Sequence, residues 1–301
     1  MARERLVGLD LVAYLAIRGL ACGLKLIPWP MALAAVRGLA HIACLADRRH
    51  REVALDNLRH AFPGQHSPQQ LQRLVLAVYE HLAIMLFELV WLPSKFRKDS
   101  WRRFVTLPED FERILDTKRP LLVVTAHYGS WEAANYCLGL LGANAHLVAR
   151  TLDNPFLNRL MHRFRESTGN HVLSKKGDLE RMRQTLAADG VLCTVADQYA
   201  GSRRGMFVNF FGRPASTHKA VAVLALRYKA TIVVVGLQRL GAPFRYVLRM
   251  TDAIDPRDYA DDADAIRSIT QRATLAVERL VLHDPSQYLW LHRRWRKSRA
   301  A

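Results

Sequence analysis

Apolar residues recur at two different periods along this chain, and the change between them divides it. Over the first hundred residues the apolar positions repeat every three or four residues, the period of a helix with one buried face. From Pro120 onward, short apolar runs alternate with helical stretches. Such alternation is typical of a mainly parallel sheet with helices on its faces. The pattern therefore predicts an α/β fold, with a mainly parallel central sheet, behind an amphipathic, membrane-anchoring helical region.

The N-terminal region is predicted to hold four helices. Apolar helices are expected over 6–27 and 31–46, and a basic helix follows and ends at Pro63. The pair Ser67-Pro68 is typical of a helix start, because serine caps free amides and proline fits the first turn. The helix that it opens carries a long stripe of apolar residues.

The remaining elements follow from the alternating part of the chain. Strands are expected over 120–126, 144–149, 171–174, 190–196, 206–211, 231–238 and 244–250. Helices are expected over 130–141, 154–168, 178–188, 215–228 and 263–283. The last two strands are close enough in sequence to form a hairpin. We divide the chain into membrane-associated helices at 1–46 and an α/β domain at 47–301, whose helical lead-in is 47–118.

The first apolar segment is unusual for a soluble domain. Between residues 6 and 27 its only charged residues are Asp10, Arg18 and Lys25. Arg18 and Lys25 share one helical face, from which long side chains reach lipid headgroups. No segment of 18 or more apolar residues lacks a charge, so no clean membrane span is predicted. Our first interpretation of this segment is a helix that lies in the membrane interface. A tilted membrane span is the second interpretation, and an ordinary core helix is the third.

Composition narrows the classes of partner. The formal net charge is +17, which attracts nucleic acid, acidic membranes, phosphorylated substrates or acidic carrier proteins. The charge is spread through the body and no nucleic-acid-binding motif is present, so no nucleic acid is expected. The four cysteines stand singly, without metal-ligand spacing. They indicate a reducing compartment, and neither a metal nor a cofactor is expected.

The strongest candidate chemistry follows the first predicted strand. His127 comes directly after that strand, and Glu132 falls in the first turn of the next predicted helix. Open α/β sheets build sites at the carboxyl ends of strands. A carboxylate that accepts from one imidazole nitrogen leaves the other nitrogen free to take a proton. A His–Glu pair at this spacing also occurs by chance, so the strand–turn–helix context is what favours catalysis.

Other charged residues are weaker candidates. Asp197 also follows a predicted strand, where it either aligns a hydroxyl nucleophile or a cationic partner, or caps a turn. Arg165 gains interest only if its helix turns it towards His127, because most helical arginines are solvated. Arg203 and Arg204 stand between glycines, where they form either a phosphate clamp or a solvated loop.

The last segment mixes aromatic and basic residues. Trp290 and Trp295 lie among arginines, an arrangement that suits a membrane–water boundary or a nucleic-acid surface. His292, in the same segment, is expected to be structural.

Read together, these stretches resemble the lipid A late acyltransferases, the lauroyl/myristoyl transferase family, whose relatives include acyltransferases of phosphatidylinositol mannosides. The resemblance covers nearly the whole chain. It is carried by Arg48-Arg49, Asn57-Leu58, Phe62-Pro63, His127 to Glu132, Arg150, Asn154-Pro155, Asp197, Phe210-Phe211-Gly212 and the segment Gln287-Tyr-Leu-Trp-Leu-His-Arg-Arg.

The resemblance implies roles for particular residues. The family's HxxxxE/D motif matches His127 as general base and Glu132 as its acidic partner. The family's functional arginine falls on Arg165. Its acid after the fourth strand falls on Asp197, although Gln198 stands here where relatives often carry a second acid.

The implied reaction passes an acyl group directly from a thioester to a hydroxyl. The donor is acyl carrier protein or acyl-CoA, the acceptor is a lipid A-like glycolipid, and no cofactor is needed. The amides of Gly129 and Ser130 are candidate oxyanion donors, and Arg150, Arg203 and Arg204 are candidates for binding the acceptor. The resemblance places the enzyme at the anionic surface of the inner (cytoplasmic) membrane, with its catalytic body facing the cytoplasm.

Two alternatives remain open. One is the same chemistry on another acceptor, a phospholipid or a mannosylated glycolipid. The other is a non-enzymatic basic protein that binds membranes or nucleic acid. Fractionation separates the classes, because an acyltransferase of this kind needs detergent for release, whereas salt releases a nucleic-acid binder.

Overall fold

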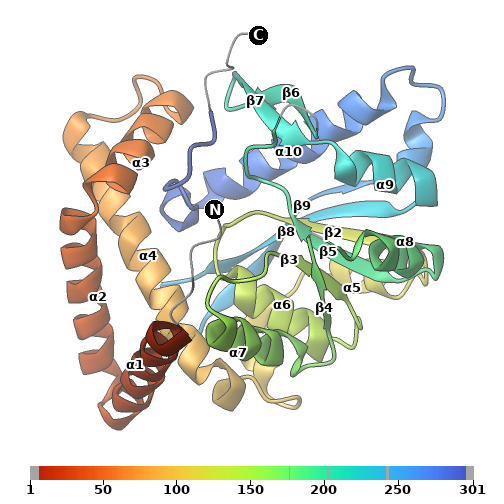
Figure 1. The fold of residues 1–301 in the computed structure, drawn as a ribbon. Coiled ribbons are helices and arrows are strands. Elements are labelled where there is room, and N and C mark those ends of the chain that lie inside the picture. The colour runs from red at the N-terminus through yellow and green to blue at the C-terminus, as the bar shows by residue number, and fades with distance from the viewer. Residues whose placement is uncertain (1–6, 176, 202–203, 242–243, 296–301) are drawn as a thin grey trace.

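The fold of this protein, seen in a computed structural model, is built on a central seven-stranded sheet with helices on both faces (Figure 1). The structure describes residues 7–175, 177–201, 204–241 and 244–295. The strand order in the sheet is β1-β9-β8-β2-β5-β3-β4. The strands are β1 (Val105–Thr106), β2 (Leu121–Thr125), β3 (His146–Ala149), β4 (His171–Ser174), β5 (Val191–Val195), β8 (Thr231–Arg239) and β9 (Tyr246–Ile254).

Strand β2 lies in the middle of the sheet and pairs in parallel with both β5 and β8. Strand β9 pairs antiparallel with β8, which confirms the predicted hairpin and the mainly parallel α/β fold. All residues of β2 are buried, because helices cover both faces of the sheet. Leu122 and Val124 belong to the core on one face, and Leu121 and Val123 to the core on the other.

The helices that follow β1 divide between the two faces. They are α5 (Glu109–Leu115), α6 (Trp131–Leu140), α7 (Pro155–Glu166), α8 (Leu179–Ala187), α9 (Ala220–Tyr228) and α10 (Ala265–His283), with short 3-10 turns at Trp101–Arg103, Pro256–Tyr259 and Pro285–Gln287. Helices α5 and α6 contribute to the core of one face, and α8, α9 and α10 to that of the other. Every helix expected after residue 119 is present, with shifted ends in several cases.

One predicted helix begins too early in the sequence. The helix expected over 215–228 begins only at Ala220, and its first residues form β7 (Arg213–His218) instead. Strand β7 pairs antiparallel with β6 (Gly205–Phe210) as a separate two-stranded ribbon. Phe211 and Gly212 between them both have positive φ, the conformation that a tight two-residue hairpin turn requires. Strand β7 contains proline, serine and threonine rather than an apolar run, so its pattern gave no strand signal.

The N-terminal region is helical, as predicted, and comprises α1 (Val7–Leu26), α2 (Trp29–Ala46), α3 (Arg48–Ala61) and α4 (Pro68–Lys95). Ser67 caps α4, with Gln70 completing a reciprocal capping box. The strand β1 and helix α5, in the expected lead-in, were not predicted. Nothing in the structure tests the division of the chain at residue 46, which stays a prediction.

Helices α1, α2 and α4 are each long and apolar enough to cross a membrane. This corrects the expectation that no clean span exists, because a few charges do not disqualify a helix of this length and hydropathy. No residue of α1 is buried, so the interpretation of α1 as an ordinary core helix is wrong. Helix α4 differs, because it buries polar as well as apolar side chains within the domain.

Helix α1 is attached to the body near α7. The Tyr14 ring lies 5.8 Å from that of Phe156, and Asn154 Nδ2 donates to the Asp10 carbonyl at 2.7 Å. Helix α2 instead packs along α4, burying Ala32 and Val36. The outward faces of both helices carry exposed leucine, valine and isoleucine side chains. These exposed faces suit an apolar surrounding rather than water.

Candidate active site

The carboxyl ends of β2 and β5 bring His127 and Asp197 together. The two strands pair in register up to Thr125 and Val195, so the residues that follow them emerge side by side. The His127 backbone amide donates to Asp197 Oδ2, and His127 Nδ1 lies 2.9 Å from Asp197 Oδ1. One carboxylate therefore holds both the backbone and the ring of His127.

Burial and charge fix the protonation of this pair. The Asp197 side chain is fully buried; burial raises its pKa, but the charge and hydrogen bonds of His127 outweigh this and hold it well below its usual range. An ionised carboxylate only accepts hydrogen bonds, so Nδ1 of His127 carries the proton and Nε2 has a free lone pair. Burial lowers the pKa of His127, but the charge and hydrogen bond of Asp197 outweigh it, and the pKa is raised. The imidazole is 22% exposed and so remains accessible.

Glu132 does not fill the role expected of it. Its two carboxylate oxygens accept from Arg165, from Nε at 3.0 Å and from Nη2 at 2.5 Å. Among the described residues, the hydrogen bonds of the His127 ring go to Asp197 instead. The structure therefore corrects the predicted pairing, because the acid that follows β5 bonds to the imidazole, whereas the acid in the first turn of α6 bonds to Arg165. Glu132 still adds a negative charge that raises the pKa of His127.

Arg165 also lies beside this turn, and its role in binding substrate stays a prediction. Helix α7 turns it inward, so that only 15% of its side chain is exposed, and it forms a two-bond pair with Glu132 at the start of α6. Pairing with Glu132 raises the pKa of Arg165 against the effect of burial. The pair joins α6 and α7 next to the His127 turn.

The turn after His127 is rigidly bonded, which corrects a second expectation. The Gly129 amide donates to the Gln287 carbonyl at 2.9 Å, and the Ser130 amide donates to the Leu237 carbonyl at 2.8 Å. Both amides are occupied by backbone partners, so they cannot donate to an oxyanion in this conformation. A Cβ at Gly129 would lie 2.0 Å from the Leu237 carbonyl oxygen, and φ there is +58°. The turn thus requires glycine.

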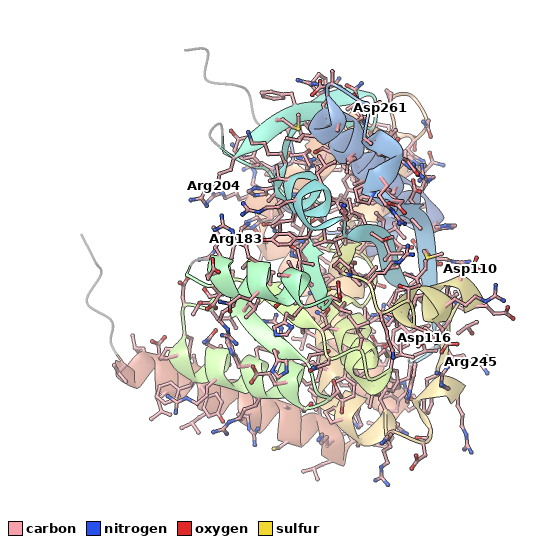
Figure 2. All side chains as sticks on the ribbon, turned by 90° about the vertical axis from the view of Figure 1, so that its right-hand side faces the viewer. Asp110, Asp116, Arg183, Arg204, Arg245 and Asp261 are labelled. Carbon is pink, nitrogen blue, oxygen red and sulfur yellow. The ribbon has the colours of Figure 1, made fainter. Side chains whose placement is uncertain are left out.

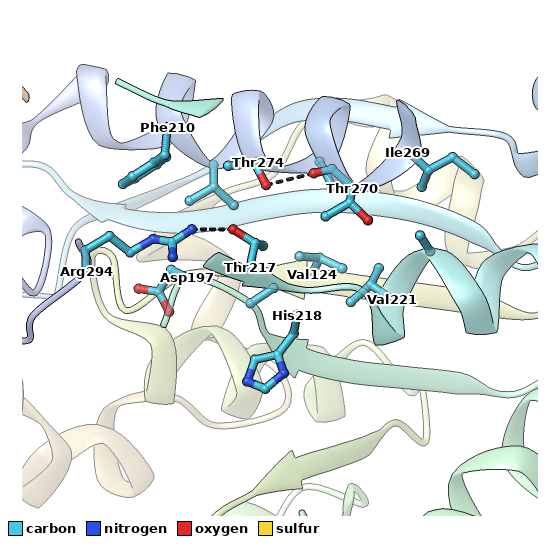
Figure 3. Close-up of a pocket in the computed structure, with 14 residues that line it drawn as sticks. Val124, Asp197, Phe210, Thr217, His218, Val221, Ile269, Thr270, Thr274 and Arg294 are labelled. Atoms are coloured by element: carbon cyan, nitrogen blue, oxygen red, sulfur yellow. Dashed lines mark hydrogen bonds between the residues drawn. The ribbon is translucent and has the colours of Figure 1, made fainter. Parts of the chain in front are cut away.

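A buried arginine lies behind the His127–Asp197 pair. Arg294 is 2% exposed and donates to the Ser216 carbonyl and the Thr217 hydroxyl, at 2.8 and 2.6 Å. Figure 3 shows Arg294 and Asp197 at one end of a cavity beneath α10, whose remaining wall is largely apolar. Burial lowers the pKa of Arg294, and the negative charge of Asp197 opposes that effect. Arg294 therefore anchors β7 and places a positive charge near the pair.

The other predicted arginines lie outside this cluster. Arg150 is exposed and pairs with Asp153 at 3.4 Å. Arg204 lies exposed before β6, as Figure 2 shows. Burial lowers the pKa of His218, and the charges of Lys175 and Arg204 lower it further. Arg203 falls outside the described residues. Their roles in binding stay predictions.

His292 lies in the last part of the fold and is largely buried. Its Nδ1 lies 2.8 Å from the Leu289 carbonyl oxygen, and the backbone carbonyl of His292 accepts from Asn57 Nδ2 at 2.7 Å. These bonds suit the structural role expected of it. Its charge interaction with Asp197 shows that it also lies near the site. Among the described residues, no three His, Cys, Asp or Glu side chains gather as a metal ion would require.

Comparison with known proteins gives a consistent set of relatives. Residues 4–297 match the family model described as bacterial lipid A biosynthesis acyltransferase. The chain is 25% identical over 275 residues to a lipid A biosynthesis lauroyltransferase of Escherichia coli, covering 90% of this chain and 87% of that protein. It is 23% identical to a lipid A biosynthesis palmitoleoyltransferase of the same organism, over 83% of this chain and 79% of that one.

A solved structure gives a weaker likeness. The 1-acyl-sn-glycerophosphate acyltransferase PlsC of Thermotoga maritima aligns with a TM-score of 0.38 and 12% identity, over 83% of this chain and 97% of that one. A likeness at that level bears on neither fold nor function.

Proposed function

This chain belongs to the bacterial lipid A biosynthesis acyltransferase family, and on that premise we propose that it moves a fatty acyl group from a thioester to a hydroxyl of a lipid A-like glycolipid at a membrane. The family match over residues 4–297 makes the chain an acyltransferase. The relatives named above for lauroyl and palmitoleoyl transfer support the lipid A-like acceptor. The observation that carries the mechanism is the hydrogen bond of His127 Nδ1 to the buried carboxylate of Asp197.

In this mechanism His127 is the general base. Its Nε2 takes the proton of the acceptor hydroxyl while that oxygen attacks the thioester carbonyl carbon. Asp197 stabilises the imidazolium that forms and keeps its Nδ1–H in place. The tetrahedral intermediate collapses as the carbon–sulfur bond breaks, and the thiolate takes the proton from Nε2. The products are an ester and a free thiol, and a base of this kind contributes about 10²–10⁴-fold in rate.

The Arg165–Glu132 pair is proposed to serve the acceptor. Glu132 engages Nε and Nη2 of Arg165, and within the described part of the chain this leaves the Nη1 edge of the guanidinium for an anionic group. Glu132 holds that edge in position and offsets part of the cost of burying Arg165. Arg150, Arg203 and Arg204 are proposed to add positive potential for the acceptor and for an acidic donor, either acyl carrier protein or acyl-CoA.

The exposed apolar faces of α1 and α2 support attachment to the membrane. We place the catalytic body on the cytoplasmic side of the inner membrane, where thioester donors are made and where three buried free thiols are stable. Attachment of α1 beside α7 supports a site that opens close to the lipid surface.

Mass spectrometry of total lipids tests the function. Cells that lack the gene are expected to accumulate a lipid A-like glycolipid one acyl group short. The wild-type gene should restore that group, and the His127→Ala variant should not. An unchanged glycolipid, together with an acyl group missing from a phospholipid or a mannosylated lipid, would overturn the acceptor while keeping the chemistry. An unchanged lipid profile would overturn the function.

A further inference from the structure

A buried polar cluster connects α4 to the turn that carries His127. His81 and Glu88 lie seven residues apart on one face of α4, at 4% and 0% exposure. Arg239, the last residue of β8, is 8% exposed and lies between them. Its Nε and Nη2 donate to the two oxygens of Glu88 at 2.9 and 2.8 Å, and its Nη1 lies 2.9 Å from Nδ1 of His81.

These bonds determine the tautomer of His81. A guanidinium has only donors, so His81 Nδ1 must accept and its proton must lie on Nε2. Burial lowers the pKa of His81, and the Arg239 charge lowers it further, to about 3, so the ring is neutral. The Nε2–H then donates to the Gly129 carbonyl oxygen at 3.1 Å. The cluster thus runs from a carboxylate through a guanidinium and an imidazole to the backbone of the turn.

The same cluster is bonded to the other support of the turn. The Gln287 side chain accepts from the Arg239 amide and donates to its carbonyl, both at 2.9 Å, and the Gln287 carbonyl accepts from the Gly129 amide. The Leu289 amide donates to the His127 carbonyl at 2.9 Å. Gly129 is therefore held at its amide by segment 287–289 and at its carbonyl by α4.

We propose that His81 is a positioning residue for acyl transfer, which holds the Gly129 carbonyl and through it directs the His127 imidazole. The inference rests on the proposed role of His127. A buried ionic cluster could serve stability alone, but this one ends on the backbone two residues from the base. Burial and the Arg239 charge keep His81 neutral, and the bond from Arg239 to Nδ1 leaves the proton on the nitrogen that faces Gly129. A shift of about 1 Å in a catalytic group costs about 10²-fold in rate.

Two matched substitutions separate positioning from packing. In His81→Asn the amide oxygen takes the place of Nδ1 and accepts from Arg239, but the side chain is too short to reach Gly129. In His81→Gln the amide nitrogen extends to the place of Nε2 and donates to the Gly129 carbonyl. His146→Asn, a histidine at the opposite, amino end of β3, is the control.

The assay uses the full chain in detergent micelles, with lauroyl thioesters of acyl carrier protein and of coenzyme A as donors and an underacylated lipid A precursor as acceptor. We expect His81→Asn to lower kcat about 10²-fold while both KM values stay within about twofold. His81→Gln should recover most of kcat, and His146→Asn should match the wild type. Thermal unfolding checks that each variant is folded. If His81→Asn does not fold, the kcat of His81→Gln alone decides. A kcat of His81→Gln below a tenth of the wild-type value then overturns the proposal.

Parallel measurement of His127→Ala distinguishes the two claims. An inactive His127→Ala together with a fully active, folded His81→Asn overturns the positioning role and leaves the base intact. An active His127→Ala overturns the role of His127 as general base and with it the positioning role of His81, whereas a wild-type protein that transfers no acyl group overturns the proposed function itself. A change in KM without a change in kcat at His81→Asn assigns the cluster to substrate binding and also overturns positioning.

Discussion

Replacing Asp197 by asparagine tests the tautomer on which the mechanism depends. His127 presents two donors to this side chain, its backbone amide and Nδ1–H, each 2.9 Å from a carboxylate oxygen. Asparagine has only one acceptor oxygen, and its amino group only donates. If the oxygen keeps the backbone bond, the amino group faces Nδ1, which must then accept. The ring proton moves to Nε2 and blocks the base.

The expected loss is large. In serine proteases the same carboxylate-to-amide change behind a catalytic histidine, with the same wrong tautomer, costs about 10⁴ in kcat. At 1.36 kcal/mol per tenfold, this is about 5 kcal/mol of transition-state stabilisation. We expect Asp197→Asn to lower kcat about 10³–10⁴-fold, with little change in acceptor KM, because Asp197 is buried and does not contact solvent.

The pH profile adds a second, independent readout. The base works when neutral, so activity is lost as pH falls through the pKa of His127, which Asp197 raises above its usual value. Asp197→Asn removes that negative charge, so the acid limb of the residual activity should move to lower pH. The assay is initial-rate acyl transfer from about pH 5 to about pH 9, with thermal unfolding of each variant as a check.

Asp252→Asn is the matched control. Asp252 is likewise a mostly buried carboxylate with charged partners, Arg272 and Arg279 at 2.9 and 2.8 Å, but it lies on β9, which is not a neighbour of β2 in the sheet. We expect its kcat and acid limb to equal those of the wild type. A kcat of Asp197→Asn within about threefold of the wild type, or an unmoved acid limb, would refute the assignment of Asp197 as the partner of His127.

Three further predictions follow from the contacts. Gly129→Ala should lower the free energy of unfolding by roughly 3 kcal/mol or more, since its Cβ would lie 2.0 Å from a carbonyl oxygen at φ +58°. Gly142 also has positive φ, but nothing lies within 4 Å of its Cβ, so equal losses of stability for Gly129→Ala and Gly142→Ala in urea unfolding would contradict the clash. Glu132→Gln leaves the mostly buried Arg165 without its charged partner and should cost about 3 kcal/mol of stability. Adding Arg165→Gln should recover part of that loss, and strict additivity of the two losses in a double-mutant cycle would exclude coupling between Glu132 and Arg165. Deleting residues 1–27 should lower the fraction of protein retained on sedimented anionic vesicles and leave the melting temperature of the remaining chain unchanged, because α1 buries no residue. Equal retention of the full and the shortened chain would show that α1 does not anchor the protein.

The position of the site was predictable from the sequence, but its pairing was not. A buried apolar run followed by histidine, glycine and serine is enough to place His127 at a strand end. The strand that precedes Asp197, β5, is the fourth along the alternating region and yet neighbours β2 in the sheet. Strand order depends on how the helices pack, which local periodicity does not encode, so the nearer acid in sequence was taken as the partner.

Other misses have local causes. Strand β7 contains proline, serine and threonine, so its residues were assigned to the following helix. His81 and Glu88 were not predicted as site residues, although polar residues on the buried face of a helix such as α4 signal buried partners. Only the fold shows that Arg239, more than 150 residues away, is the partner of both.

The most direct test of the central claim is acyl transfer by His127→Asn. The asparagine amide nitrogen takes the place of Nδ1 and still donates to Asp197, so the buried carboxylate keeps a partner, but no basic nitrogen remains. His171→Asn, at the amino end of β4, is the control. We predict that kcat falls about 10²–10⁴-fold in His127→Asn, with acceptor KM and melting temperature retained and the control unchanged. A folded His127→Asn variant with wild-type kcat would contradict the account.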